Sequence, residues 1–557
     1  MRRGWEGIFS HFAGMIGLLL IAVLSILGNP GKVQAVVPKS GGALTVGVEV
    51  EFRGFDPLKA VYLQSGDRSV IMAIEERLFG MDRKGNLVPE LATSATPSED
   101  GKTWTIKLRE GVSYHDGTPF NADAVVDHWQ RILAPANRYS GAAYIEAIES
   151  VKKIDDYTIT FILKHPWAAL MPMLSSSQWT AAFIPSPKSV RENTQNRAPV
   201  GTGPFIFKEW IAKDRLVVAR NPNYWRKGLP YLDTVTFRPI PDIEVRFSGL
   251  LSGGTNVILT DSGSQILKAE KDRTLKVYGS NSSGPFTFII NTDKAPLNDV
   301  RVRRALAHAW NQDLYLKTVF SGTLTVARTP YGGAISCGDS GYREYDPAKA
   351  RQLLADYGKP VALELLETNS PRGREAGELM KKLFNDVGVN LKLTLLPEVQ
   401  QVRRVMAGDY DISVWRLMDL NDMGPYLNVC LHSKGKLNFS NYQNPAMDQL
   451  LEVQQQSTDE KTRNKALCGI ANLINEDVMY LYGGDRRIQA IAKTSIQGMD
   501  PFDQGIVRVS EAWVKEEKEA GKVEKVEKAK KVKKPAKAKK SNKPKKLNKP
   551  KKSNKDN

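Results

Sequence analysis

Residues 197–242 read RAPVGTGPFIFKEWIAKDRLVVARNPNYWRKGLPYLDTVTFRPIPD, and they give the clearest indication of the fold. Gly201 and Gly203 permit backbone φ angles that side chains forbid, so they predict a sharp turn before the strand that follows. Tyr224 and Trp225 can bury large apolar surfaces behind a second turn. These residues build a scaffold and do not identify a ligand, so we expect a structural role for the stretch.

Three blocks in this stretch resemble the signature of the bacterial extracellular solute-binding proteins of family 5, the peptide and nickel type. The blocks are PVGTGPF at 199–205, ARNPNYW at 219–225 and PYLDTVTFRPIPD at 230–242. Two further segments, 75–117 and 296–322, also resemble blocks of this family. The resemblance therefore covers most of the chain through several separated motifs.

The resemblance implies an α/β fold, a two-lobed periplasmic binding protein of type II with an extra domain inserted in the first lobe. A hinge is expected to join the lobes, with the ligand between them. The expected parts are a signal peptide at 1–35, the first lobe at 36–65, the inserted domain at 66–196, the first lobe again at 197–283, the second lobe at 284–480, a return to the first lobe at 481–510, and a disordered lysine-rich tail at 511–557.

The first residues have the pattern of a secretion signal. Arg2 and Arg3 form a positive region, an apolar run extends from Ala13 to Leu27, and Val33-Gln34-Ala35 offers a small-residue cleavage site. The run is about 15 residues, shorter than the roughly 20 needed to span a bilayer. We therefore expect cleavage and a periplasmic location, with an uncleaved anchor as the alternative.

The three cysteines are Cys337, Cys430 and Cys468. None lies near the cleavage site, so no lipid anchor is expected. In an oxidising compartment three cysteines allow one disulfide and one free thiol, and Cys430 with Cys468 is one of the allowed pairings.

The charge of the chain is concentrated at its C-terminus. The whole chain carries +18, and residues 528–557 contain 15 lysines and a single acidic residue. This segment has too little apolar content to bury a core, so we expect disorder. An exported protein is not expected to meet nucleic acid. Anionic lipid or a cell-wall polymer are the expected partners of the tail, and a purely solubilising tail is the alternative.

Residues 361–415 give the clearest α/β pattern. Residues 361–366 form a strand-like run, residues 376–387 place apolar side chains on one helix face, and residues 389–395 alternate as a second strand. A further strand ends near Trp415. This order predicts a parallel sheet, with ligands bound at the carboxyl ends of its strands.

Residues 296–322 are expected to contain an amphipathic helix capped by Asp299. The arginines Arg301, Arg303 and Arg304 are expected to face outward or toward a neighbouring element, and a solvated face is the favoured interpretation. The buried stripe consists of apolar residues at helical spacing: Val302, Ala305, Leu306, Ala309 and Trp310.

The ligand is expected at WRLMDLNDMGPY, residues 415–426. The family usually reads W-x-W-x-x-D-x-x-D-P here, and in peptide-binding members the first aspartate can hold the α-ammonium group of the ligand. Asp419 and Asp422 match the two acids, and a carboxylate in a partly dry cleft gains from such a charge-assisted bond. Leu417 and Glu398 stand where aromatic residues are common in the family. The candidate ligand-binding residues are Asp419, Trp415, Arg416, Met418, Glu398, Tyr62 and Tyr482.

Three short motifs invite a catalytic or metal-binding interpretation. His115-Asp116 lacks a third ligand at suitable spacing, so hydrogen bonding in a turn explains it better. The string CGDSG at 337–341 imitates a serine-protease nucleophile but lies in a glycine-rich loop. Cys430 and His432 provide only two metal ligands. We expect no enzyme, no metal site and no cofactor.

These patterns predict the periplasmic substrate-binding component of an ABC importer. It is expected to capture short peptides by hinge closure, to deliver them to an inner-membrane permease and to act as a monomer. The alternatives are a binding protein for a nickel chelate, an opine-like or sugar-derived solute or another cationic solute, an envelope-tethered protein acting through its basic tail, and a hydrolase favoured only by the CGDSG string.

Overall fold

The computed structural model describes residues 37–60, 64–82, 86–279, 284–331, 335–417, 422–485, 487–499 and 505–515. The predicted signal peptide and residues 516–557 of the predicted disordered tail lie outside these ranges.

The first sheet has seven strands. Along β11, Val257 and Leu259 pack on one face with the helix α2 (Ser65–Ile74), whereas Ile258 packs on the other face with α6 (Ile243–Ser252) and α7 (Gly263–Glu270). This alternation buries both faces of the sheet. The strand order is β12 (Leu275–Gly279), β18 (Gln489–Lys493), β11 (Val257–Thr260), β1 (Ala43–Val48), β10 (Thr234–Pro239), β9 (Arg215–Arg220) and β8 (Phe205–Ile211).

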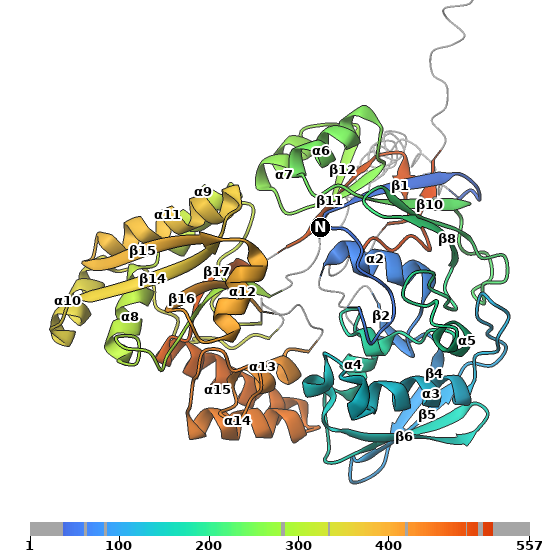
Figure 1. Ribbon diagram of the computed structural model, residues 1–557, viewed down its shortest axis with the longest axis horizontal. Coiled ribbons are helices and arrows are strands. Elements are labelled where there is room, and N and C mark those ends of the chain that lie inside the picture. The colour runs from blue at the N-terminus through green and yellow to red at the C-terminus, as the bar shows by residue number, and fades with distance from the viewer. Residues whose placement is uncertain are drawn as a thin grey trace, which may run out of the picture. The chain divides into compact units, whose positions relative to one another are not determined.

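The second sheet has five strands, and its strand β14 is parallel to both β15 and β16. The parallel pairing predicted for residues 361–415 is confirmed. Helices α8, α10 and α11 surround β14 and β15 in Figure 1. The strand order is β15 (Val389–Leu396), β14 (Val361–Thr368), β16 (Ile412–Arg416), β13 (Pro285–Ile290) and β17 (Tyr480–Asp485). The helices are α8 (Val300–Ala309), α9 (Gln312–Phe320), α10 (Pro347–Tyr357), α11 (Pro371–Asn385), α12 (Glu398–Met406), α13 (Gly424–Leu431), α14 (Pro445–Gln456) and α15 (Glu460–Asp477).

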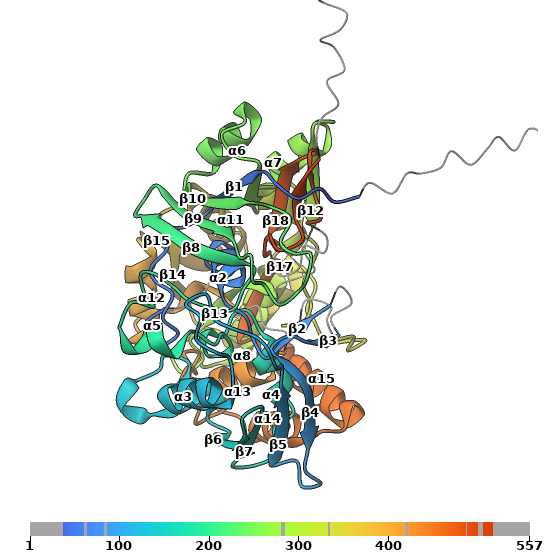
Figure 2. The ribbon, with the colours of Figure 1, turned by 90° about the vertical axis from the view of Figure 1, so that its right-hand side faces the viewer.

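A third, antiparallel sheet of four strands lies within the segment predicted as the inserted domain. Helix α3 (Ala122–Leu133) packs against this sheet (Figure 2), and the side chain of Asn121 caps it by accepting from the backbone N–H of Ala124. The strand order is β4 (Ala92–Pro97), β5 (Thr103–Leu108), β7 (Thr158–Leu163) and β6 (Ile148–Asp155). The other elements are β2 (Phe79–Met81), β3 (Leu87–Pro89), α4 (Leu170–Ser175), α5 (Pro187–Arg191), β19 (Ile496–Gln497) and β20 (Trp513–Val514).

The chain passes twice between the seven-stranded and five-stranded sheets, from β12 to β13 and from β17 back to β18. Two predicted boundaries need correction. Strand β17 pairs with β13, so the second lobe extends to Asp485 and not to residue 480. Helix α2 packs in the core of the first sheet, although it was assigned to the inserted domain. An apolar run shows that an element is buried but not which core receives it. The other boundaries stay a prediction.

Gly201 and Gly203 are needed for a reason other than the predicted one. Neither has a positive φ. A Cβ on Gly201 would lie 2.2 Å from the carbonyl oxygen of Ile74, and one on Gly203 would lie 2.7 Å from the carbonyl carbon of the same residue. The glycines therefore allow the signature to approach the end of α2 closely.

The predicted buried stripe of α8 and its cap at Asp299 are confirmed. The expectation that Arg303 is solvated is wrong, because this residue is only 6% exposed. Its guanidinium donates to the carbonyl oxygens of Leu297 and Asp477, the latter at the C-terminus of α15. Carbonyls at a helix C-terminus lack partners within the helix, and a neighbouring arginine can satisfy them.

The disulfide joins Cys337 to Cys468, and Cys430 is a buried free thiol on α13. Of the pairings that the sequence allowed, Cys430 with Cys468 is therefore excluded. Spacing along the chain did not reveal the disulfide of Cys337 with Cys468, because these residues are 131 positions apart and meet only when a loop folds against α15.

None of the helices in the described ranges is long and apolar enough to cross a bilayer. The apolar run at Ala13–Leu27 precedes those ranges.

Candidate ligand-binding site

The carboxyl ends of β14 and β16 lie at one edge of the second sheet, because the two strands are parallel. Trp415 and Arg416 are the last residues of β16, and both are partly exposed. The indole of Trp415 packs edge-on against Phe439 with ring centroids 5.6 Å apart. The backbone carbonyl oxygen of Trp415 accepts a hydrogen bond from the hydroxyl of Thr287 at 3.4 Å. Both predicted residues are thus at the edge where α/β sheets bind ligands.

Met418 and Asp419 follow Leu417 in the sequence but lie outside the described residues, as does Tyr62. Their proposed contacts with the ligand stay predictions. The second acid of the motif, Asp422, has a structural role. Its side chain is 7% exposed, accepts from Nη2 of Arg463 at 2.6 Å, and accepts from the backbone N–H of Gly424 at 2.8 Å. Asp422 therefore fixes the start of α13.

Glu398 and Tyr482 have contrasting environments. Glu398 is exposed at the first residue of α12, which follows the carboxyl end of β15. Tyr482 is 1% exposed within β17, and its carbonyl oxygen accepts from the indole of Trp310 and the amide of Gln312, each at 2.7 Å. Tyr482 is part of the core of the second lobe, and packing explains it better than ligand contact.

The facing edge of the first sheet is acidic, a feature that sequence reasoning missed. Glu49 follows β1 and Asp261 follows β11, and the two strands are parallel, so both acids lie at one edge. Asp67 in the first turn of α2 adds a third carboxyl group. Burial and then the charge of Glu49 raise the pKa of Asp67 to about 7. In the sequence, an acidic residue directly after an apolar strand could have indicated this acidic edge.

An ion pair joins this edge to the second lobe. Arg372, in the first turn of α11, donates from Nη1 and Nη2 to the two carboxylate oxygens of Asp261 at 2.7 and 2.9 Å. The guanidinium also lies over the ring of Phe320, 5.1 Å from its centroid. The side chains remain 24% exposed at Asp261 and 35% at Arg372. Contacts of this kind depend on the two lobes being close together.

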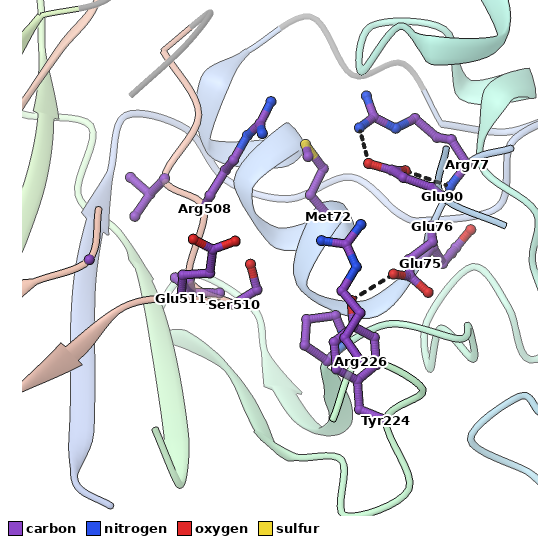
Figure 3. Close-up of a pocket in the computed structure, with 14 residues that line it drawn as sticks. Met72, Glu75, Glu76, Arg77, Glu90, Tyr224, Arg226, Arg508, Ser510 and Glu511 are labelled. Carbon is purple, nitrogen blue, oxygen red and sulfur yellow. Dashed lines mark hydrogen bonds and ion pairs between the residues drawn. The ribbon is translucent and has the colours of Figure 1, made fainter. Parts of the chain in front are cut away.

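The signature stretch surrounds a buried carboxylate, that of Glu76 (Figure 3). The hydroxyl of Tyr224 donates to one oxygen of Glu76 at 2.8 Å. The indole of Trp225 and the hydroxyl of Thr202 donate to the other oxygen at 2.7 and 2.9 Å. Burial, with a smaller effect of the nearby Glu90, raises the pKa of Glu76 to about 7.

A cavity of about 80 Å³ lies beside this carboxylate, and Arg508 and Glu511 from the C-terminal return also line it. Peptide-sized ligands occupy pockets of roughly 300 Å³ or more. Glu90 on the same cavity wall is paired with Arg77 at 3.0 Å. The cluster therefore ties α2, the signature and the C-terminal return together, in agreement with the structural role expected for the stretch.

The motifs that imitate catalytic sites have structural partners. His115 bonds through Nε2 to the carbonyl oxygen of Gly203 at 2.9 Å, so it stabilises the signature turn. Ser340 is 3% exposed and donates to the carbonyl oxygen of Arg328 at 2.9 Å, so the CGDSG string anchors a loop. Within the described ranges, no group of three or more histidine, cysteine, aspartate or glutamate side chains is placed to hold a metal ion.

The family model of the bacterial extracellular solute-binding proteins, family 5 (middle region), matches residues 86–438. This chain belongs to that family. Family 5 consists of periplasmic solute-binding proteins and not of enzymes. A probable di/tripeptide-binding protein 5 of Pseudomonas aeruginosa is 29% identical over 503 residues, 84% of this chain and 94% of that protein. The glutathione-binding protein GsiB of Pectobacterium atrosepticum is 31% identical over 366 residues, 65% of this chain and 70% of GsiB.

Solved family 5 folds extend the comparison to the whole two-lobed architecture. DppA of Helicobacter pylori in complex with the peptide STSA has a TM-score of 0.75 at 23% identity, covering 86% of this chain and 99% of DppA. NikA of Brucella suis in complex with Fe(III)-EDTA has a TM-score of 0.76 at 22% identity, covering 85% of this chain and 100% of NikA. At these identities the likeness establishes the fold, a two-lobed periplasmic binding protein.

Proposed function

We propose that this chain is the periplasmic binding component of an ABC importer and that it captures short peptides between its two lobes. The observation that carries the proposal is the position of Trp415 and Arg416 at the carboxyl edge of β16, with Asp419 three residues beyond Arg416 in the sequence. The name of the Pseudomonas relative and the bound peptide of the Helicobacter protein favour the same ligand class.

Asp419 is proposed to accept the α-ammonium group of the peptide. An ionised carboxylate in a closing cleft forms a strong charge-assisted bond, and it would be costly to leave unpaired. The indole of Trp415 offers an apolar surface next to that group. This arrangement selects for a free peptide N-terminus.

Closure follows from contacts that exist only when the lobes are together. The chain passes between the two sheets after β12 and after β17, and the hinge that the family fold implies is proposed to lie at these two passages. The Asp261–Arg372 ion pair and the bound peptide both stabilise the closed form, so ligand binding shifts the population toward it. The closed form then docks on the permease. Export by the predicted signal at 1–35 places the protein in the periplasm.

Isothermal titration calorimetry on the mature full-length chain tests this proposal. Tri-alanine with a free N-terminus is expected to bind at least about 30-fold more tightly than N-acetylated tri-alanine, because acetylation removes the partner of a buried carboxylate. Equal affinities would remove Asp419 as the anchor. Absence of binding to any di- or tripeptide would contradict peptide capture.

A cationic solute is the second candidate ligand. The carboxylate of Glu49 at the first-lobe edge and the exposed Glu398 on α12 favour it. In the same calorimetric series, tight binding of an opine-like cation or of a nickel chelate together with no response to tri-alanine would establish this alternative.

A further inference from the structure

The edge of the first sheet that lies opposite Glu49 and Asp261 carries exposed positive charge. Strands β11 and β12 are both antiparallel to β18, so they run in the same direction. Asp261 follows the carboxyl end of β11, whereas the turn at 271–274 precedes the amino end of β12. This turn therefore lies at the far edge of the sheet, away from the acidic edge that faces the second lobe.

Five exposed cations lie on this turn and beside it, and we call them the far-edge patch. They come from the last turn of α7, the turn itself, β12 and the last described residue: Lys268, Lys271, Arg273, Lys276 and Lys515. The acids nearby are Glu270 and Asp272. The carboxylate of Asp272 is used within the turn, because it accepts from the N–H and the hydroxyl of Thr274 at 2.8 and 2.7 Å. The patch is therefore positive overall.

Backbone hydrogen bonds bring Lys515 to this edge. The N–H of Lys515 donates to the carbonyl oxygen of Ser495 at 2.7 Å. The N–H of the preceding residue, Thr494, donates to the carbonyl oxygen of Thr274 at 2.9 Å. Figure 2 shows α7, β12 and β18 next to one another. The chain therefore leaves the described fold beside the far-edge patch.

The sequence beyond Lys515 becomes strongly basic after a short spacer. Residues 516–527 hold five glutamates and three lysines, and residues 528–557 hold 15 lysines and one aspartate. Neither segment contains an aromatic residue. A spacer of this length reaches about 40 Å at most when fully extended. The first lysines of 528–557 therefore stay within that distance of the far-edge patch.

A surface of closely spaced phosphate groups fits this charge. Lysine binds phosphate as a compact point charge. Each basic residue near an anionic bilayer adds to the attraction, which decays over a Debye length of about 8 Å in physiological salt. The tail can follow such a surface along its length, and the far-edge patch adds to the attraction when it lies against the same surface.

Two exposed leucines at the far edge favour a lipid surface over a cell-wall polymer. Leu251, near the end of α6, is 48% exposed, and its carbonyl oxygen accepts from Nζ of Lys493 at the end of β18 at 3.4 Å. Leu267, beside Lys268 on α7, is 39% exposed. Apolar side chains among cations gain from contact with the boundary of a bilayer. A phosphate-bearing polymer would satisfy the cations but offers no apolar layer for the leucines.

We propose that the far-edge patch and residues 528–557 together bind the surface of an anionic phospholipid membrane. The acidic edge at Glu49 and Asp261 then points away from the membrane, so the bound chain keeps its access to solutes. An ABC importer lies in such a membrane, and the contact would hold the binding protein near it. This proposal does not depend on peptide capture between the lobes.

Flotation of the mature full-length chain with lipid vesicles tests the proposal. We expect binding to phosphatidylcholine vesicles that contain about 30 mol % phosphatidylglycerol, and none to vesicles of phosphatidylcholine alone. Raising the salt to roughly 0.5 M should weaken the binding at least about tenfold, because salt screens the attraction. Equal flotation with both kinds of vesicle would overturn the proposal.

Three variants separate the tail from the far-edge patch. Deletion of 528–557 should weaken vesicle binding at least about 100-fold, and replacement of four patch cations by glutamine at least about tenfold. The patch variant carries Lys268→Gln, Lys271→Gln, Arg273→Gln and Lys276→Gln. Its control changes one arginine and three lysines, all exposed on the second lobe: Arg351→Gln, Lys359→Gln, Lys434→Gln and Lys436→Gln. The control should alter the binding by less than about twofold, because these residues lie away from the patch.

Unchanged binding after deletion of 528–557 would overturn the role of the tail, and equal losses in the patch variant and its control would overturn that of the patch. Sedimentation with purified peptidoglycan but no flotation with the anionic vesicles would assign the tail to a cell-wall polymer and contradict the proposal. Tri-alanine affinity should be the same with and without anionic vesicles. A loss of affinity would contradict the placement of the patch away from the ligand edge.

Discussion

The signature stretch and the segment that begins at Trp415 show two ways in which a family motif is used. Around Glu76, the polar atoms of Tyr224 and Trp225 are directed at a buried partner within the protein. At the end of β16, Trp415 and Arg416 remain partly exposed at a sheet edge. The polar groups around Glu76 satisfy one another within the protein, whereas the residues proposed to bind the ligand keep accessible surface. Changes in the two regions should therefore affect different measured quantities.

The largest expected effect is on stability. Tyr224→Ala removes a buried aromatic ring and one donor to Glu76, so the free energy of unfolding should fall by about 3–5 kcal/mol. Urea denaturation measures this loss. Tyr345→Ala, at a side chain 44% exposed, is the control and should cost less than about 0.5 kcal/mol. Peptide affinity of folded Tyr224→Ala should match that of the unaltered protein. A large loss of affinity would mean that the signature contacts ligand.

The converse effect is expected at Asp419. Asp419→Ala should weaken binding of tri-alanine by about 2–5 kcal/mol, because it removes one partner of a charge pair in the closed cleft. The thermal unfolding midpoint should barely change. Asp386→Ala, at an exposed acid at the end of α11, serves as the control for loss of a surface carboxylate. An affinity change below about 0.5 kcal/mol would contradict the proposal that Asp419 binds the α-ammonium group of the peptide.

A pH dependence distinguishes the buried carboxylate from the ligand edge. The pKa of Glu76 rises from its ordinary 4.5 to about 7 on folding, so the folded state holds this proton more tightly. Its contribution to stability is complete below pH 4.5 and is lost as the pH rises to about 7. Glu76→Gln should therefore reduce the loss of unfolding free energy between pH 5 and 7 by about 2 kcal/mol.

The variant compared with Glu76→Gln in this experiment is Asp67→Asn. Asp67 also has a pKa raised to about 7, so it contributes with the same sign but at the acidic edge of the first lobe. The two single variants and the double variant apportion the pH dependence between the regions. Glu76→Gln with an unchanged pH profile would contradict the raised pKa of Glu76.

The smallest expected effect concerns the ion pair between the lobes. Arg372→Gln and Asp261→Asn should each weaken tri-alanine binding by less than about 1 kcal/mol, since both side chains are partly exposed and screened. Calorimetry at low and high salt measures the effect, which should diminish as salt rises. A double-mutant cycle with no coupling would show that the pair does not contribute to closure.

Much of the fold could be predicted because local patterns agreed with the tertiary structure. In α8, and in the strands β14 and β15, apolar residues recur at the spacing of the buried face. The sequence pattern therefore identifies which face of each element is buried. Periodicity does not report which core receives an element, so α2 and β17 were assigned to the wrong parts. Arg303 was misplaced for a related reason. A charged side chain can be buried when distant carbonyl oxygens accept from it, and sequence does not show them.

The candidate site could be predicted only where a motif follows a strand. Trp415 and Arg416 could be placed at this edge because they end a strand of a parallel sheet, and their contact with a ligand stays a prediction. The ion pair of Asp261 with Arg372 joins residues 111 positions apart, and no local sequence pattern predicts such a pair. The same holds for the disulfide of Cys337 with Cys468.

Native mass spectrometry of the mature full-length chain, purified without denaturation, is the sharpest test of peptide capture between the lobes. Closed lobes retain their ligand, so we expect a series of added masses that match short peptides. A single added mass of a non-peptide solute would contradict peptide capture.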